Sequence, residues 1–121
     1  ETDSALRAKL ALLSPPADEE LAGEREWMDR VLDLAAPGAT TEEDQLVALH
    51  KFIAGTPSAL TCTNLVDMVG DRRAQNMPGT THDLYPNWCI PLTDASGKSV
   101  LLEDLTKVPL FKRVAEASQR Y

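Results

Sequence analysis

Apolar side chains recur every three or four positions in three stretches of the first half of the chain, and this spacing is typical of amphipathic helices. We expect a first helix from residues 3–4 to about Leu13, and a second with acidic residues in its first turn that stops at residues 36–38. A third helix is expected to open with a capping signature at Thr40 or Thr41. The residues expected on the buried stripes of these helices are Leu6, Leu10, Leu13, Leu21, Met28, Val31, Leu32, Ala35, Leu46, Val47, Leu49, Phe52 and Ile53.

Trp27 and His50 lie beside these stripes. We expect Trp27 to pack into a core and His50 to be a partly buried packing residue. Neither is assigned a functional role.

The second half of the chain carries shorter apolar runs between turn residues. Residues 58–63 are rich in β-compatible side chains and predict one strand. Residues 64–69 predict a helical turn that Gly70 closes, with Leu65 and Met68 directed inward.

A polar turn at residues 94–98 separates two short apolar runs, and this pattern predicts a small hairpin whose pairing Pro91 limits. One helical turn is expected at residues 103–105, followed by a final helix from Pro109 to about Gln119. The predicted fold class is therefore mainly α with one or two short strands.

Length and charge narrow the classes of function. The 121 residues make one domain's worth of chain, and 19 acidic against 12 basic residues give a net charge of −7. This balance argues against nucleic acid and against an anionic membrane surface as partners. No apolar run approaches the ~20 residues that span a bilayer. Cys62 and Cys89 are expected to be reduced thiols that act as small hydrophobes, and a disulfide between them is left open.

Turn-forming residues, side-chain amides and an indole are concentrated in residues 75–80 and 85–88, which read Gln-Asn-Met-Pro-Gly-Thr and Tyr-Pro-Asn-Trp. Pro78 and Gly79 predict a sharp turn just after Asn76. A carboxamide there suits sugar hydroxyls, and the indole of Trp88 offers a flat apolar face on which sugars stack. The alternative is a purely structural turn, in which an Asn caps local backbone groups and the Trp fills a core.

This ordered pattern resembles the closing segment of the 4-α-glucanotransferases, or amylomaltases, where it follows the last strand of a (β/α)8 TIM barrel. The match is specific over residues 73–88 and looser over residues 58–69, and this chain has Cys89 where the family usually has Arg. A whole barrel needs about 250 residues. Because the chain also begins with Glu1, we expect one carboxy-terminal fragment of such an enzyme.

The resemblance implies three parts: a helical part over residues 1–57, the last barrel strand and its loop over residues 58–92, and a turn with a terminal helix over residues 93–121. It also implies transfer of α-1,4-glucan segments between maltooligosaccharides by a retaining mechanism. Such a reaction needs two carboxyl groups about 5 Å apart. The family's catalytic carboxylates lie earlier in the chain than this segment, so we expect no catalytic residue here.

Asn76 is implied to bind substrate, with Pro78, Gly79, Thr80 and Trp88 as the loop scaffold. Trp88 is expected to pack under the loop, and the role of Tyr85 is undecided. No cofactor or metal is implied. The implied partners are the glucan substrate and the remainder of the parent barrel, and the implied location is cytoplasmic.

Two other interpretations were weighed. The chain could be a stand-alone acidic helical module whose apolar faces dock a protein partner. A metal site could be drawn from Cys62, His82, Asp83 and Cys89, but no Cys-x-x-Cys or paired-His spacing supports it.

Excision from a barrel would leave the segment 58–63 with an unpaired edge. We therefore expect this segment either to repack under the helices or to pair with a second copy of the chain.

Overall fold

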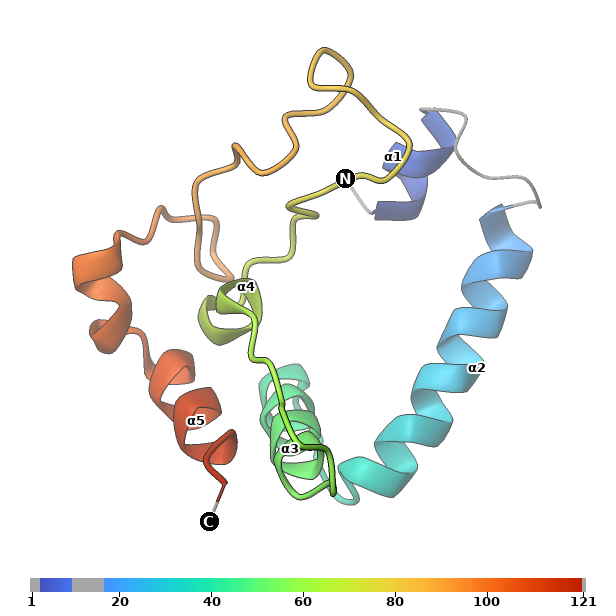
Figure 1. The fold of residues 1–121 in the computed structure, drawn as a ribbon. Coiled ribbons are helices and arrows are strands. Elements are labelled where there is room, and N and C mark those ends of the chain that lie inside the picture. The colour runs from blue at the N-terminus through green and yellow to red at the C-terminus, as the bar shows by residue number, and fades with distance from the viewer. Residues whose placement is uncertain (1–2, 10–16, 121) are drawn as a thin grey trace. The chain divides into compact units, whose positions relative to one another are not determined.

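The computed structural model describes residues 3–9 and 17–120 (Figure 1). Their helices are α1 (Asp3–Lys9), α2 (Ala17–Ala35), α3 (Glu42–Ala54), α4 (Leu65–Val69), the 3-10 helix η1 (Leu102–Lys107) and α5 (Pro109–Ala117). The chain divides into two compact units. One unit joins the described residues up to Arg30 with Arg73–Ile90, and the other joins Val31–Arg72 with the described residues from Pro91 onward.

The second unit has a core formed where α3 and α4 pack against α5. Its buried centre is Met68, Leu110 and Val114, with Leu46, Val47, Val108, Phe111 and Ala115 packed around it. Helix α5 begins at Pro109, as predicted, because a proline at the first helical position gives up no intrahelical hydrogen bond.

Helix α3 begins with the predicted cap at Thr41. The Asp44 backbone N–H donates to the Thr41 hydroxyl oxygen at 3.1 Å, and that hydroxyl donates to the Asp44 carboxylate at 2.6 Å. Arg113 of α5 pairs with the same carboxylate and with Glu43, at 3.2 Å in the latter case. The Thr41 hydroxyl first, and Arg113 second, lower the pKa of Asp44 below its usual value. The cap thus also ties α5 to the start of α3.

His50 and Met68 take up the predicted inward positions. His50 is only 7% exposed, and its Nε2 atom lies 3.6 Å from a carboxylate oxygen of Asp67 in α4. Gly70 ends α4 with a φ of 76°, a conformation that glycine adopts without steric cost. The neighbouring Leu65 is exposed rather than directed inward, so that part of the prediction is wrong.

The predicted strand at residues 58–63 is absent from the described chain. The segment is irregular, and Leu60 is 90% exposed. Its ends are held by side chains of the C-terminal region: Arg120 donates to the Ser58 carbonyl, and the Thr63 hydroxyl donates to that of Ser118 at 3.0 Å. A strand needs a neighbour to pair with, and the described residues supply none. The expected repacking beneath the helices is also not seen.

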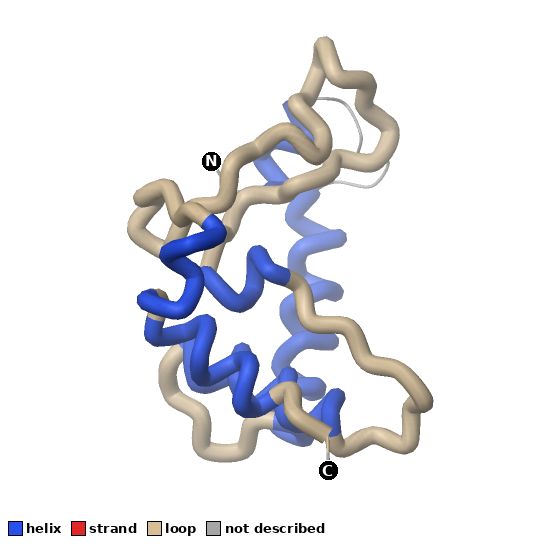
Figure 2. The backbone as a smooth tube through the Cα atoms, turned by 60° about the vertical axis from the view of Figure 1, so that its left-hand side comes forward, coloured by secondary structure: helices blue, strands red, loops and turns tan. Residues whose placement is uncertain are grey.

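The predicted hairpin is reduced to one isolated antiparallel bridge between Thr93 and Ser99. The turn between them is built on Asp94, whose carboxylate accepts from the Ser96 N–H at 2.9 Å and the Lys98 N–H at 3.1 Å. Figure 2 shows the path between α4 and η1 as loop. The prediction of a mainly helical chain is confirmed. In place of the one or two predicted strands, the described residues contain only this bridge.

Several expected core positions are exposed. Trp27 is 56% exposed, and Met28, Phe52 and Ile53 are exposed as well. Helix α2 therefore has three large apolar side chains that the described chain leaves exposed, Trp27, Met28 and Leu34. Leu10 and Leu13 lie outside the described residues.

Candidate functional site

The loop over residues 74–88, which belongs to the first unit, turns where the sequence predicts (Figure 1). The Thr80 N–H and hydroxyl both donate to the Met77 carbonyl, at 3.2 and 2.7 Å. Gly79 has a φ of 85°, as the third residue of a turn with proline second requires. Met77 is 1% exposed, so its side chain anchors the turn.

A second Asn, Asn87, holds the two arms of the loop together. Its side-chain oxygen accepts from the Met77 N–H at 2.6 Å. Its side-chain nitrogen donates to the Thr80 hydroxyl oxygen at 2.9 Å and to the Thr80 carbonyl at 3.3 Å. Asn87 is thus the amide that caps local backbone groups. The sequence signal for this role is a second Asn on the far arm of the Pro-Gly turn.

Two further hydrogen bonds join the arms. The Tyr85 hydroxyl donates to the Ala74 carbonyl at 2.5 Å, and the Trp88 backbone N–H donates to the Gln75 carbonyl at 2.7 Å. Tyr85, undecided from sequence, therefore anchors the base of the loop in this structure.

Asn76 lies between Gln75 and Met77, whose backbone groups are hydrogen-bonded, but the side chain of Asn76 is not bonded in this way to any described residue. Its side chain is half-buried and makes no hydrogen bond with any residue that the structure describes. An amide has two donor hydrogens and an acceptor oxygen. The loop therefore fixes the backbone on both sides of Asn76 and leaves its polar atoms available to a ligand.

Trp88 does not pack under the loop, in contrast to the expectation. Its side chain is 77% exposed, and its φ of 61° lies in the left-handed region. This conformation is an outlier for a bulky residue. The loop closes through the Trp88 backbone N–H, which donates to the Gln75 carbonyl at 2.7 Å, and this bond does not involve the indole.

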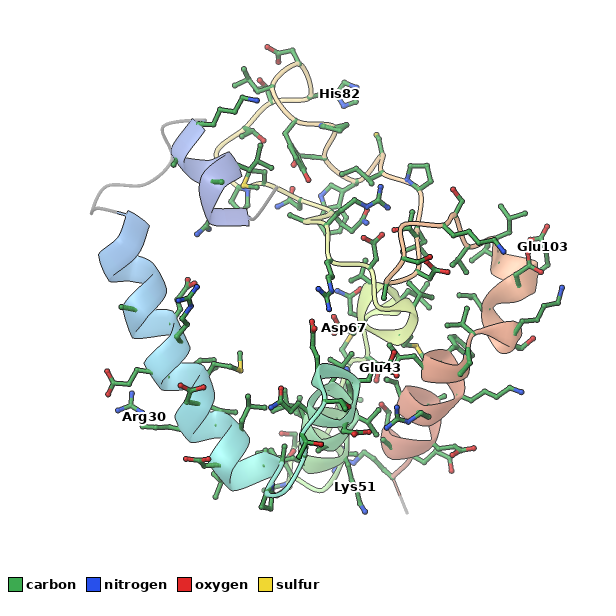
Figure 3. All side chains as sticks on the ribbon, turned by 180° about the vertical axis from the view of Figure 1, so that it is seen from behind. Arg30, Glu43, Lys51, Asp67, His82 and Glu103 are labelled. Atoms are coloured by element: carbon green, nitrogen blue, oxygen red, sulfur yellow. The ribbon has the colours of Figure 1, made fainter. Side chains whose placement is uncertain are left out.

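The loop carries one acidic residue, Asp83. A hydrogen bond from the Thr81 hydroxyl at 2.5 Å is the main cause that lowers the pKa of Asp83. Figure 3 labels His82 at the outer end of the same loop. A retaining glycosyl transfer needs a pair of carboxyl groups, so the loop can bind a polar, uncharged ligand but cannot supply that pair.

Other constellations offer less. Among the described residues, no group of three or more His, Cys, Asp or Glu side chains is arranged to hold a metal ion. Cys62 and Cys89 are free thiols, and both are exposed rather than used as buried hydrophobes. Within the described helices, none has the length and apolar character needed to cross a membrane.

An open depression of about 680 Å³ lies in the second unit between the Asp94 turn and the start of α5. Its carboxylates are already paired: Asp94 with its own turn, Asp104 with Lys107 at 2.6 Å, and Glu43 with Arg113. It therefore presents few unpaired groups to a ligand.

The turn thus displays a carboxamide that has no partner among the described residues, close to an exposed indole. The family model of the 4-alpha-glucanotransferases matches residues 14–96, and the chain belongs to this family.

The 4-alpha-glucanotransferase of Mycobacterium tuberculosis (strain H37Rv) is 46% identical over 119 residues, as is that of Mycobacterium bovis. The alignment covers 93% of this chain and 16% of each relative. The crystal structure of an amylomaltase from Corynebacterium glutamicum superposes with a TM-score of 0.89 at 47% identity, over 98% of this chain and 19% of that one. The chain thus spans less than a fifth of the length of these relatives.

Proposed function

We propose that this chain is the carboxy-terminal part of a 4-alpha-glucanotransferase, which transfers α-1,4-glucan segments between maltooligosaccharides by a retaining mechanism. In this proposal the parent is a (β/α)8 barrel, residues 58–63 are its last strand, and the loop that follows lies at the face where barrel enzymes bind substrate. The chain contributes contacts to substrate and not the catalytic carboxylates. Family membership supports the proposal, as does the amylomaltase likeness along the chain.

The observation that carries the proposal is the difference in hydrogen bonding between the side chains of Asn87 and Asn76. Asn87 uses its carboxamide on Met77 and Thr80, whereas Asn76, one residue before Met77, has a carboxamide with no partner among the described residues. A loop whose backbone is already ordered does not have to be ordered when a ligand binds. Asn76 is therefore the residue we assign to the substrate, with Pro78, Gly79 and Thr80 as its scaffold.

The test is Asn76→Ala in the enzyme expressed from the intact reading frame, with maltotriose disproportionation as the assay. Loss of a hydrogen bond to the substrate leaves a polar group unpaired, which costs about 1–3 kcal/mol. We expect kcat/KM to fall about 5- to 150-fold with an unchanged melting temperature.

Asn64→Ala is the matched control. Asn64 accepts from the Val66 N–H at 3.4 Å at the start of α4, so the same substitution there removes a helix cap. It should lower stability slightly and leave kcat/KM unchanged. Unaltered kinetics in a well-folded Asn76→Ala enzyme would remove Asn76 from the site.

The proposal also predicts that the isolated 121-residue polypeptide transfers no glucan, since the loop lacks a carboxyl pair. Clear turnover of maltotriose by this polypeptide would contradict it. No metal or organic cofactor is part of the proposal. The location proposed is the cytoplasm, where thiols such as the two free ones found here stay reduced.

The exposed apolar side chains of α2 fit the same proposal. Trp27 and Leu34 are both exposed, and in a chain that spans 16% of its relatives the remaining polypeptide is available to cover them. A stand-alone interaction module would show similar exposed side chains, so they do not favour that alternative.

A further inference from the structure

We propose that Trp88 is a second substrate-binding residue of the Asn76 loop, with its indole stacked on a glucosyl ring of the oligosaccharide that Asn76 binds. The inference rests on the proposed function and names a further binding group of that same site. It reverses the expectation from sequence that the indole packs beneath the loop.

The first argument is that the indole has no structural task in the loop. The loop is closed by the Trp88 backbone N–H, which donates to the Gln75 carbonyl at 2.7 Å, and any residue except proline has that group. The buried side chain of the turn is Met77, which is 1% exposed. The Trp88 side chain is left 77% exposed.

The second argument concerns the backbone at Trp88. Its φ of 61° is a conformation that glycine adopts freely and that bulky side chains disfavour. A glycine at this position would keep the closing hydrogen bond without strain. Sparsely populated backbone conformations persist where the surrounding structure enforces them, and they cluster at ligand sites. The strain is consistent with an indole that is held outward for binding.

The third argument is proximity. Because Trp88 is hydrogen-bonded to Gln75, its Cα atom lies within roughly 7 Å of the Cα atom of Asn76. Neither side chain carries charge, which suits a neutral sugar. An amide that pairs with hydroxyls, next to an aromatic face that covers the C–H surface of a ring, matches the two chemical faces of a pyranose.

The test uses the enzyme from the intact reading frame and compares Trp88→Ala, Trp88→Phe and Trp27→Ala. We expect Trp88→Ala to raise the KM for maltotriose on the order of tenfold, as loss of one aromatic contact implies. Trp88→Phe should recover most of that loss because it restores an aromatic face. Trp27→Ala removes an indole of α2, which lies outside the loop, and should leave the KM unchanged.

A direct readout of contact is fluorine NMR of enzyme labelled with 5-fluorotryptophan. The resonance that disappears in Trp88→Phe should shift on addition of maltotriose. If that resonance stays in place, or if Trp88→Ala lowers the melting temperature without changing the KM, the indole packs against the rest of the enzyme and the inference is overturned.

Failure of the proposed function has a different signature. In that case the unmodified enzyme transfers no glucan, and Asn76→Ala changes nothing that can be measured. If instead Asn76→Ala impairs transfer and Trp88→Ala does not, the proposed function stands and only the role of Trp88 is lost.

Discussion

Asn87 offers the sharpest test of how the loop is held. Its side-chain oxygen accepts from the Met77 N–H at 2.6 Å, and Met77 is buried. Asn87→Ala removes that acceptor and both donors to Thr80, at 2.9 and 3.3 Å. The Met77 N–H would then be left without a partner in a place that water reaches poorly.

The magnitude follows from the partner that is left behind. An unsatisfied buried N–H costs about 1–3 kcal/mol, more than the net value of an average hydrogen bond. Local opening that exposes the Met77 amide should become easier by the same amount. Its hydrogen exchange in the 121-residue chain should therefore speed up about 5- to 150-fold.

Asn87→Asp separates the acceptor from the donors. The new carboxylate keeps an oxygen for the Met77 N–H but cannot donate to Thr80, whose hydroxyl hydrogen is already given to the Met77 carbonyl at 2.7 Å. We expect Met77 to exchange at a rate between those of the original chain and Asn87→Ala. The measurement is native-state amide exchange by ¹H–¹⁵N NMR, with the amide of Val114, in the core of the other unit, as the internal reference. If Met77 already exchanges freely in the original chain, Asn87 does not hold the loop as described here.

Three further predictions concern the second unit and are measured by urea denaturation. Leu110→Ala should lower the free energy of unfolding by about 2–5 kcal/mol because it empties the core, whereas Leu102→Ala, at an exposed side chain, should change it by less than about 0.5 kcal/mol. Gly70→Ala should destabilise more than Gly97→Ala. Both glycines have positive φ, but only at Gly70 would a Cβ atom meet two side-chain carbons at 3.3 Å. Equal losses in the free energy of unfolding would refute the expected crowding at Gly70. The lowered pKa of Asp44 means that its carboxylate adds stability above the unfolded-state pKa near 3.8 and loses it as pH falls through the folded-state pKa. Asp44→Asn should therefore lose less stability on acidification from about pH 5 to pH 2 than the original chain, and an equal loss would contradict this role.

The features that the sequence predicts correctly depend on local chemistry. The cap at Thr41, the glycine that ends α4 and the turn at residues 77–80 each require residues within four positions of one another. Periodicity over longer stretches also identifies α3 and α5, because these two helices and α4 pack against one another within the chain.

The features that the sequence predicts wrongly depend on partners far along the chain or outside it. A period of 3.6 residues indicates which face of α2 is apolar but not what covers it, so Trp27 was assigned to a core and is exposed. Residues 58–63 have strand-forming side chains, yet a strand exists only when a neighbour accepts its hydrogen bonds. The sequence does not show that Asn87 bonds to Met77 and Thr80 while Asn76 makes no such bond, because both are amides that flank one turn.

The contrast between these two groups bears on the candidate site itself. The hydrogen bonds of Tyr85, Asn87 and Trp88 that join the arms of the loop lie within residues 74–88, so these contacts are encoded locally. The segment 58–63, by contrast, needs neighbours that the described chain lacks. Binding energy that is not used to order a loop remains available for the substrate. In the proposed function, the Asn76 loop can thus present its amide and the Trp88 indole together to the glucan.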